Sequence, residues 1–127
     1  MRILLDTCTF LWVCLASDEF SSTAQQLYFE AEEVYLSPVS SWEIAVKFRL
    51  GKLNLPEDPG TWVPRQRIAH GIETLPLQET ATLAILKLPD LHKDPFDRML
   101  ICQAMYEGLV LLTPDPLIRA YPIRTQW

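Results

Sequence analysis

Two aspartates stand at or just beyond the ends of short apolar runs. Asp6 directly follows the run Arg2–Leu5, and Asp115 lies two residues past the run Leu109–Thr113. If both runs are buried parallel strands, the aspartates share the carboxyl-end edge of one sheet, where open α/β sheets form their sites. Either residue alone is explained equally well as a turn or helix cap. The pair becomes informative only if further acids reach the same edge.

The segment Lys93–Arg98 supplies a third acid with a more specific position. Pro95 suits the first helical residue, which makes Asp94 the N-cap and Asp97 the third helical residue. Asp97 shares one helical stripe with apolar or small residues: Leu100, Ile101, Ala104 and Gly108. We therefore expect Asp97 to point toward the sheet. A carboxylate turned inward needs partners, and a metal ion suits that role if other acids converge.

A fourth acid, Glu43, lies in the first turn of a helix that Ser40 or Ser41 can cap. The helix dipole alone would favour a glutamate there. Several carboxylates close together repel one another unless a divalent cation holds them. Oxygen ligands without histidine or cysteine favour Mg²⁺ or Mn²⁺ over zinc. Such a cluster performs phosphoryl chemistry with one ion, or with two about 4 Å apart.

The histidines and cysteines are not expected to bind metal. His70 and His92 are isolated from each other, and the cysteines form no CxxC pair. We expect Cys8, Cys14 and Cys102 to be reduced thiols in the core of a cytosolic protein.

Short apolar runs alternate with helical patterns along the whole chain, which predicts an α/β fold. Strands are expected at 2–5, 34–36, 74–75, 109–113 and 123–126. Helices are expected at 9–16, 23–31, from 40 or 41 to 50, at 61–69, 78–86 and 95–107, with a helical turn after Pro116. We expect a single domain over residues 1–127, with a central parallel sheet of about five short strands and helices on both faces.

The composition is that of an ordinary globular protein, with 49 % hydrophobic and 21 % charged residues among 127. A net charge of −5 is unusual for a nucleic-acid enzyme. Either the acids are concentrated in a metal site, or nucleic acid is not the substrate. The N-terminal run reaches Asp6 too soon for a secretory signal, and no apolar run would span a membrane. We expect a soluble, cytoplasmic protein.

Four motifs in sequence resemble the PIN-domain ribonucleases of the VapC toxin family. They are LLDT at 4–7, SSWEIAVKFRLGKL at 40–53, LHKDPFDRMLICQA at 91–104 and LVLLTPD at 109–115. The resemblance implies an endoribonuclease dependent on Mg²⁺ or Mn²⁺, with RNA as substrate. It also implies a homodimer and a small DNA-binding antitoxin that inserts a segment into the acidic cleft.

The resemblance assigns metal binding and catalysis to four acids: Asp6, Glu43, Asp97 and Asp115. Thr7 and Thr113 flank the site and could orient water or phosphate, and Asp94 is a supporting residue or a cap. Pro114 and Pro116 depart from the family pattern and could re-aim Asp115.

In the mechanism that we expect, Asp6 and Asp97 hold the principal Mg²⁺ with support from Asp115. Glu43 binds a second ion or acts as the general base. The RNA backbone would meet five basic residues, each of which could equally be solvated surface: Lys47, Arg49, Lys52, Lys93 and Arg98. Trp42 could stack on a base, although a role in the core or an interface is favoured.

Three alternatives compete with the prediction of a ribonuclease. A phosphatase of the haloacid dehalogenase type needs an aspartate at position 8, which is Cys8. A receiver domain needs an aspartate ending a middle strand and a lysine ending a later one, and the chain has neither. The strongest alternative is a PIN-like module that binds RNA or an antitoxin without cleaving.

Overall fold

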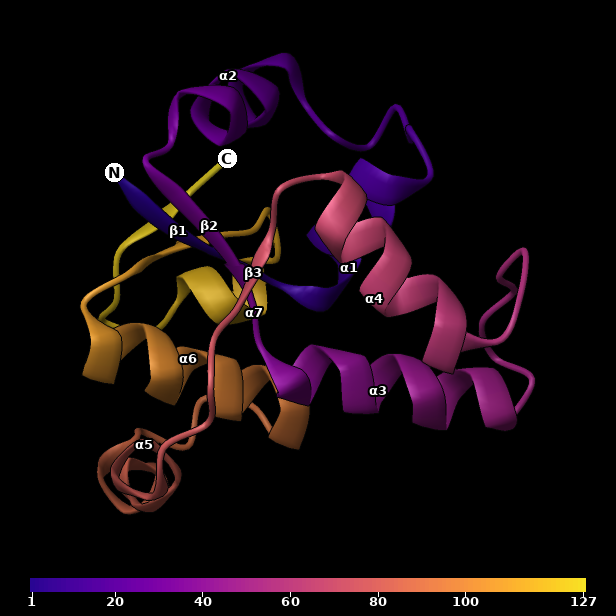
Figure 1. The fold of residues 1–127 in the computed structure, drawn as a ribbon. Helices are drawn as coiled ribbons and strands as arrows, with labels where there is room; N and C mark the ends of the chain where they lie inside the picture. The colour runs from indigo at the N-terminus through magenta and orange to yellow at the C-terminus, as the bar shows by residue number, and fades with distance from the viewer.

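The computed structural model describes all of residues 1–127, built around a five-stranded, all-parallel sheet in the order β3-β2-β1-β4-β5 (Figure 1). The strands are β1 Arg2–Leu5, β2 Glu33–Leu36, β3 Glu73–Thr74, β4 Val110–Leu112 and β5 Thr125–Gln126. The chain first runs outward from β1 to β2 and β3, and then returns to the other side of β1 for β4 and β5. The strand order therefore reverses between β1 and β4, where Asp6 and Asp115 follow the strand ends.

Seven α-helices and one 3₁₀ helix connect the strands. They are α1 Thr7–Cys14, α2 Ser22–Glu30, α3 Pro38–Arg49, α4 Pro59–Ala69, α5 Glu79–Leu83, the 3₁₀ helix η1 Ala84–Lys87, α6 Pro95–Glu107 and α7 Pro116–Arg119. No helix in the structure is long and apolar enough to cross a membrane. The predicted α/β fold, with a parallel sheet of five strands, is confirmed.

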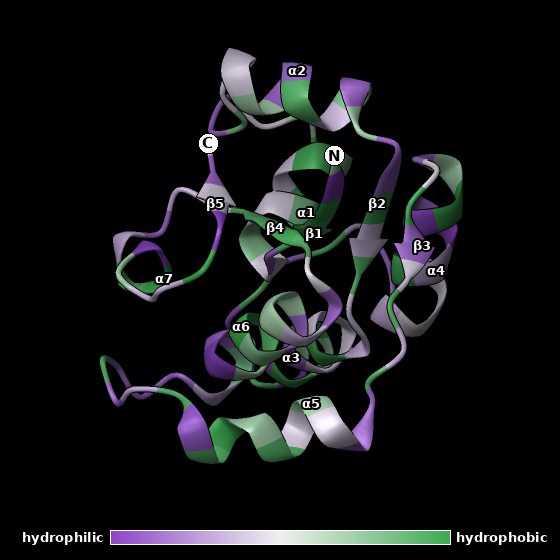
Figure 2. Cartoon of the chain, turned by 90° about the vertical axis from the view of Figure 1, so that its left-hand side faces the viewer, coloured by the Kyte–Doolittle hydropathy of each residue, from purple (hydrophilic) through white to green (hydrophobic).

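Two hydrophobic clusters cover the two faces of the sheet, because successive side chains of a strand point to opposite faces. Ile3 and Leu5 of β1 belong to a cluster with residues of α1, α2, α3 and α4. Leu4 between them belongs to a second cluster with residues of α6 and α7. Figure 2 shows this layering, with α2 on one side of the sheet and α5 and α6 on the other.

The start of α3 differs from the prediction. We expected Ser40 or Ser41 as the cap, but Ser37 is the N-cap, and its Oγ accepts from the backbone N–H of Val39 at 3.0 Å. Pro38 occupies the first helical position, which its fixed φ suits. The helix therefore begins earlier, and Glu43 lies inside it rather than in its first turn.

The expected helix at 61–69 also begins earlier, at Pro59, with Asp58 as its N-cap. The expected helix at 78–86 is shorter and continues as η1. The helix predicted at Pro95–Glu107 has those bounds, and Gly108 ends it in the left-handed conformation at φ 67°. That φ favours glycine, since other residues carry a Cβ that clashes there.

Candidate functional site

The four acids named from the sequence line one cavity of about 300 Å³. Asp6 follows β1 and caps α1, Glu43 comes from α3, Asp97 from the first turn of α6, and Asp115 is the N-cap of α7. The same cavity is lined by Thr7, Cys8, Trp12, Pro114 and Pro116. Elements that are far apart in the sequence thus bring these carboxylates together beyond the carboxyl ends of β1 and β4.

Asp6 is held rigidly at the end of β1. The backbone N–H of Thr9 donates to Asp6 Oδ1 at 2.7 Å, and the hydroxyl of Thr113 donates to Oδ2. The Thr113 hydroxyl also accepts from the backbone N–H of Asp115 at 3.1 Å. Thr113 therefore connects the two aspartates that follow the neighbouring strands β1 and β4. It does so through protein contacts, whereas we expected it to orient water or phosphate.

Glu43 is only 4 % exposed, so its carboxylate requires partners. The hydroxyl of Thr7 donates to Oε1 at 2.6 Å, and the ammonium of Lys47 pairs with Oε2. Thr7 Oγ1 also lies 3.0 Å from the hydroxyl of Ser40, one turn earlier in α3. Thr7 thus orients the Glu43 carboxylate directly.

Asp97 points inward from the start of α6, as the stripe of apolar residues predicted. Its Oδ2 lies 3.1 Å from His92 Nε2. Asp94 caps the helix beside it, because its Oδ1 accepts from the backbone N–H groups of Phe96 at 2.9 Å and Asp97 at 3.1 Å. The predicted cap at Asp94 is confirmed.

Asp115 both caps α7 and lines the cavity. Its Oδ1 accepts from the backbone N–H of Leu117 at 2.9 Å, and Pro116 occupies the first helical position of α7. The flanking prolines do not turn Asp115 away, since Asp115, Pro114 and Pro116 all line the cavity with the other acids.

Burial, with a smaller contribution from neighbouring charges, makes Asp97 and Asp6 easier to protonate. The pKa of Asp97 is raised to about 6: burial is the main cause, the hydrogen bond from His92 opposes it, and the charges of Asp94, Glu43 and Asp115 add to it. Burial also raises the pKa of Asp6, as does the charge of Asp115, against the hydrogen bonds from Thr113 and Thr9. Both shifts therefore reflect chiefly the burial of these two carboxyl groups, with neighbouring carboxylates acting in the same direction.

The donor set fits a hard divalent cation in its chemistry. Four carboxylates face one cavity, and Lys47 is the one permanent cation among their hydrogen-bond and ion-pair partners. However, no three of the chain's acidic, histidine or cysteine side chains are gathered as a ready-made metal site. The carboxylates are turned toward threonine hydroxyls, Lys47 and His92, so some would have to rotate to share an ion.

The five basic residues expected to contact RNA fall into three groups by their exposure. Arg49 and Lys52, at the end of α3, and Lys93, before α6, are exposed. Lys47 is partly buried and pairs with Glu43, which lines the cavity. Arg98 is buried, and its guanidinium donates to the carbonyl of Pro89 at 2.8 Å and to other protein groups. This burial argues against RNA contact by Arg98.

Cys8 lies outside the core in which we expected it, and Trp42 does not belong to the core either, so an interface role for Trp42 stays a prediction. Cys8 is an exposed residue at the cavity and does not belong to the core. Partial desolvation of its sulfur, together with the charges of Asp6 and Glu43, raises the pKa of the thiol to about 11, so the thiol is neutral at pH 7. Cys14 is partly buried and Cys102 is buried, and all three are free. Trp42 is 60 % exposed, and its ring packs edge-on against Phe96 with centroids 4.8 Å apart.

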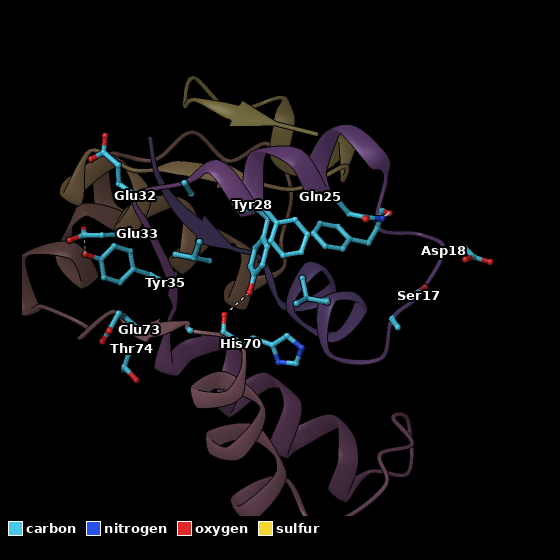
Figure 3. Close-up of a pocket in the computed structure, with 17 residues that line it drawn as sticks. Ser17, Asp18, Gln25, Tyr28, Glu32, Glu33, Tyr35, His70, Glu73 and Thr74 are labelled. Carbon is cyan, nitrogen blue, oxygen red and sulfur yellow. Dashed lines mark hydrogen bonds between the residues drawn. The ribbon is translucent and has the colours of Figure 1, made fainter.

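A larger cavity of about 990 Å³ lies elsewhere, between α2, β2 and β3 (Figure 3). Its acids are spread around the rim: Asp18, Glu32, Glu33 and Glu73. Their carboxylates point apart, while Tyr28 crosses the centre and donates to the carbonyl of His70 at 2.8 Å. The smaller cavity is therefore the better candidate for chemistry, since only there do the acids come from converging elements.

Sequence reasoning missed the polar groups behind Asp97. We expected His92 to be isolated and predicted no role for Tyr121, yet the two rings are in contact and His92 reaches Asp97. One signal was available for His92, because it lies five residues before Asp97 in the segment that leads into α6. No local pattern indicated Tyr121, which follows α7 and reaches His92 only through the fold.

Comparisons with known proteins agree with this architecture. The sequence profile of the PIN domain matches residues 3–123. Ribonuclease VapC22 of Mycobacterium tuberculosis is 24 % identical over 120 residues, which are 94 % of this chain and 91 % of that protein. Ribonuclease VapC16 of the same organism is 34 % identical over 68 residues, and the match covers 54 % of this chain but only 48 % of that protein.

Solved structures give the same result for the fold. VapBC2 from Rickettsia felis, bound to a promoter DNA fragment, has a TM-score of 0.74 at 14 % identity, with 100 % of this chain and 99 % of that chain covered. DNA-bound VapBC from Salmonella typhimurium has a TM-score of 0.71 at 18 % identity, with 99 % and 97 % covered. The chain therefore belongs to the PIN domain family, and within that family it is similar to the VapC toxins of VapBC toxin–antitoxin systems.

Proposed function

We propose that the protein is a metal-dependent endoribonuclease and the toxin of a type II toxin–antitoxin pair, formed by one PIN domain over residues 1–127. The observation that carries the proposal is the single cavity lined by four carboxylates: Asp6, Glu43, Asp97 and Asp115. Its position beside the reversal of strand order supports a site there. Similarity to the ribonucleases VapC22 and VapC16 supports RNA as the substrate.

Asp6, Asp97 and Asp115 would hold Mg²⁺ or Mn²⁺, because hard divalent cations prefer carboxylate oxygens. A cation bound there would neutralise charge on the phosphate and lower the pKa of a bound water. Glu43 would either bind a second ion or accept the proton of the attacking water. Lys47 and Thr7 keep the Glu43 carboxylate oriented for either role.

Hydrolysis would follow an in-line path. The water oxygen attacks phosphorus and gives up a proton, and the bond to the 3′ oxygen breaks. That oxygen takes up a proton, which leaves a 3′-hydroxyl and a 5′-phosphate. Arg49, Lys52 and Lys93 would contact the RNA backbone from outside the cavity, because they are exposed and have no ion-pair partner.

The proposal includes two protein partners. The similar structures from Rickettsia felis and Salmonella typhimurium are VapBC complexes bound to DNA, so we propose a small DNA-binding antitoxin for this chain. The net charge of −5 suits a partner that carries basic residues. We also propose a homodimer, as the family resemblance implies.

The test is RNA cleavage by the purified, partner-free protein in Mg²⁺, Mn²⁺ or EDTA. Asp97→Asn removes one carboxylate of the cavity, whereas Glu73→Gln removes an exposed carboxylate of the other cavity and serves as the matched control. We expect cleavage that EDTA abolishes, that Glu73→Gln retains, and that Asp97→Asn reduces by more than roughly 100-fold, since loss of a group that supports a ligand already costs about 10–100-fold.

Wild-type protein that folds but cleaves no RNA in either metal would overturn the proposal. The better interpretation would then be a PIN-like module that binds RNA or an antitoxin without cleaving RNA. Cleavage that persists in Asp97→Asn would instead show that the chemistry lies outside this cavity. Mapping of the product ends as 5′-phosphate and 3′-hydroxyl checks the direction of attack.

A further inference from the structure

A chain of hydrogen bonds behind Asp97 ends on the carboxylate oxygen that faces His92. His92 Nε2 lies 3.1 Å from Asp97 Oδ2, and His92 Nδ1 lies 2.8 Å from the hydroxyl of Tyr121. The groups are withdrawn from solvent, with side-chain exposures of 9 % for His92 and 18 % for Asp97. Tyr121 as a whole is 3 % exposed.

Two groups that can only donate determine which atom donates in each of these hydrogen bonds. Arg98 Nη1 donates to the Tyr121 oxygen at 2.9 Å, and the backbone N–H of His92 donates to it at 3.2 Å. A guanidinium and an amide N–H have no lone pair to offer, so the Tyr121 oxygen is the acceptor in both contacts. Its own hydrogen is then left for the one remaining neighbour, His92 Nδ1.

The tautomer of His92 follows from this assignment. Nδ1 must be the acceptor, so the ring hydrogen of neutral His92 lies on Nε2. Nε2–H then donates to Asp97 Oδ2, because an ionised carboxylate can only accept. Arg98 is itself held in place, because its guanidinium also donates to the carbonyl of Pro89 and to Asp90 Oδ1 at 3.1 Å.

We propose that Tyr121 and Arg98 lock His92 as the Nε2–H tautomer, and that His92 is thereby a positioning residue that holds Asp97 for the cavity. The hydrogen bond occupies Oδ2, and Oδ1 has no hydrogen-bond partner in the protein, so that oxygen remains free for a cation. The positioning of Asp97 toward metal rests on the proposed function, whereas the tautomer does not.

The tautomer is tested first, on wild-type protein without metal. The ¹⁵N shifts of the His92 ring at neutral pH distinguish a protonated Nε2 from a protonated Nδ1. We expect Nε2–H in the wild type and loss of this fixed tautomer in Tyr121→Phe, which removes only the hydroxyl. A wild-type spectrum with the hydrogen on Nδ1 overturns the proposal, and this measurement requires no variant to fold.

A matched pair of variants then tests the positioning of Asp97. His92→Gln retains an N–H donor near the Nε2 position, whereas His92→Asn carries its amide near Nδ1 and leaves Asp97 without a donor. Mn²⁺ affinity is measured by calorimetry, and RNA cleavage is measured beside it. We expect His92→Asn to lose roughly 10–100-fold in Mn²⁺ affinity and His92→Gln to stay close to wild type.

Thermal unfolding of the apo variants separates positioning from stability. A merely structural role would lower the Tm of His92→Asn and leave its Mn²⁺ affinity equal to that of His92→Gln, and this result overturns the proposal. If wild type binds Mn²⁺ but cleaves no RNA, the proposed function fails while the two affinities still decide the role of His92. A wild type that binds no Mn²⁺ overturns the proposed function and the positioning role of His92, while the ¹⁵N measurement still decides the tautomer.

Discussion

At the scale of single residues, the site depends on hydroxyl groups as much as on carboxylates. Thr7 and Thr113 each donate to a buried acid, Glu43 and Asp6 respectively. A buried carboxylate that loses a donor keeps the cost of its desolvation. The threonines therefore make it possible for this chain to bury two acids side by side.

Thr7→Val tests this dependence, because it keeps the shape of the side chain and removes the hydroxyl. We expect the free energy of unfolding to fall by about 1–3 kcal/mol, the usual cost of a buried group left without its partner. Thr7→Ser keeps the donor to Glu43 and should stay much closer to wild type. Urea denaturation of the three proteins checks the prediction, and equal losses in both variants would contradict it.

The raised pKa of Asp97 predicts how the free energy of unfolding depends on pH. Burial raises its pKa to about 6, so between about pH 4 and pH 6 the folded protein holds this proton more tightly than the unfolded chain does. The contribution of Asp97 to the free energy of unfolding therefore falls as pH rises through that window, and it is constant above it.

Asp97→Asn cannot titrate at this position, so it serves as the comparison. The stability of Asp97→Asn minus that of wild type should increase from pH 4 to pH 6, on the order of 2 kcal/mol. Urea denaturation of metal-free protein at several pH values measures the difference. A difference that stays constant across the window would show that the carboxyl group has an ordinary pKa.

At the scale of elements, caps decide where the helices that carry the site begin. Ser37, Asp94 and Asp115 cap α3, α6 and α7, and each is followed by a proline at the first helical position. This pairing of cap and proline fixes the start of a helix locally. It explains why the bounds of α6 agree with the prediction, and why α3 was misplaced when Ser40 or Ser41 was taken as its cap.

Asp94→Ala tests the contribution of one cap to the site. The variant removes the acceptor for two backbone N–H groups, including that of Asp97, and should cost about 1 kcal/mol of unfolding free energy. Asp94→Asn removes the same charge but retains the cap, so it should unfold close to wild type. Chemical denaturation distinguishes the two, and an Asn variant as unstable as the Ala variant would attribute the effect to charge instead.

At the scale of the whole molecule, the cavity connects elements from most of the chain. Asp6, Glu43, Asp97 and Asp115 come from both hydrophobic layers and both sides of the strand reversal. A cation shared by these residues would bind the folded state only. Its binding free energy would therefore add to the stability of the entire fold.

Mn²⁺ should accordingly raise the Tm, by about 10 °C at a concentration near 100 times its dissociation constant. The rise should be smaller at pH 5 than at pH 7.5, because protons compete for Asp97 below about pH 6. Asp97→Asn should show little response at either pH. Thermal unfolding with and without EDTA measures these shifts, and a rise that is independent of pH would contradict competition at Asp97.

The sequence by itself determined the features that depend on neighbours in the chain. Apolar runs and helical spacing predicted the parallel sheet, and Pro95 and Gly108 marked the ends of α6. The rule that sites follow strand ends made Asp6 and Asp115 candidates, and the apolar stripe of α6 predicted that Asp97 points inward. These inferences work because backbone geometry repeats along each element.

Only the tertiary structure decided which side chains meet. The strand order brought Thr113 to Asp6, helix packing brought Thr7 to Glu43, and the segment after α7 brought Tyr121 to His92. It also exposed Cys8 and buried Arg98. Such contacts join residues 29 to 107 positions apart, and local periodicity carries no information about them. They depend on how the helices pack on both faces of the sheet, which is a property of the whole chain.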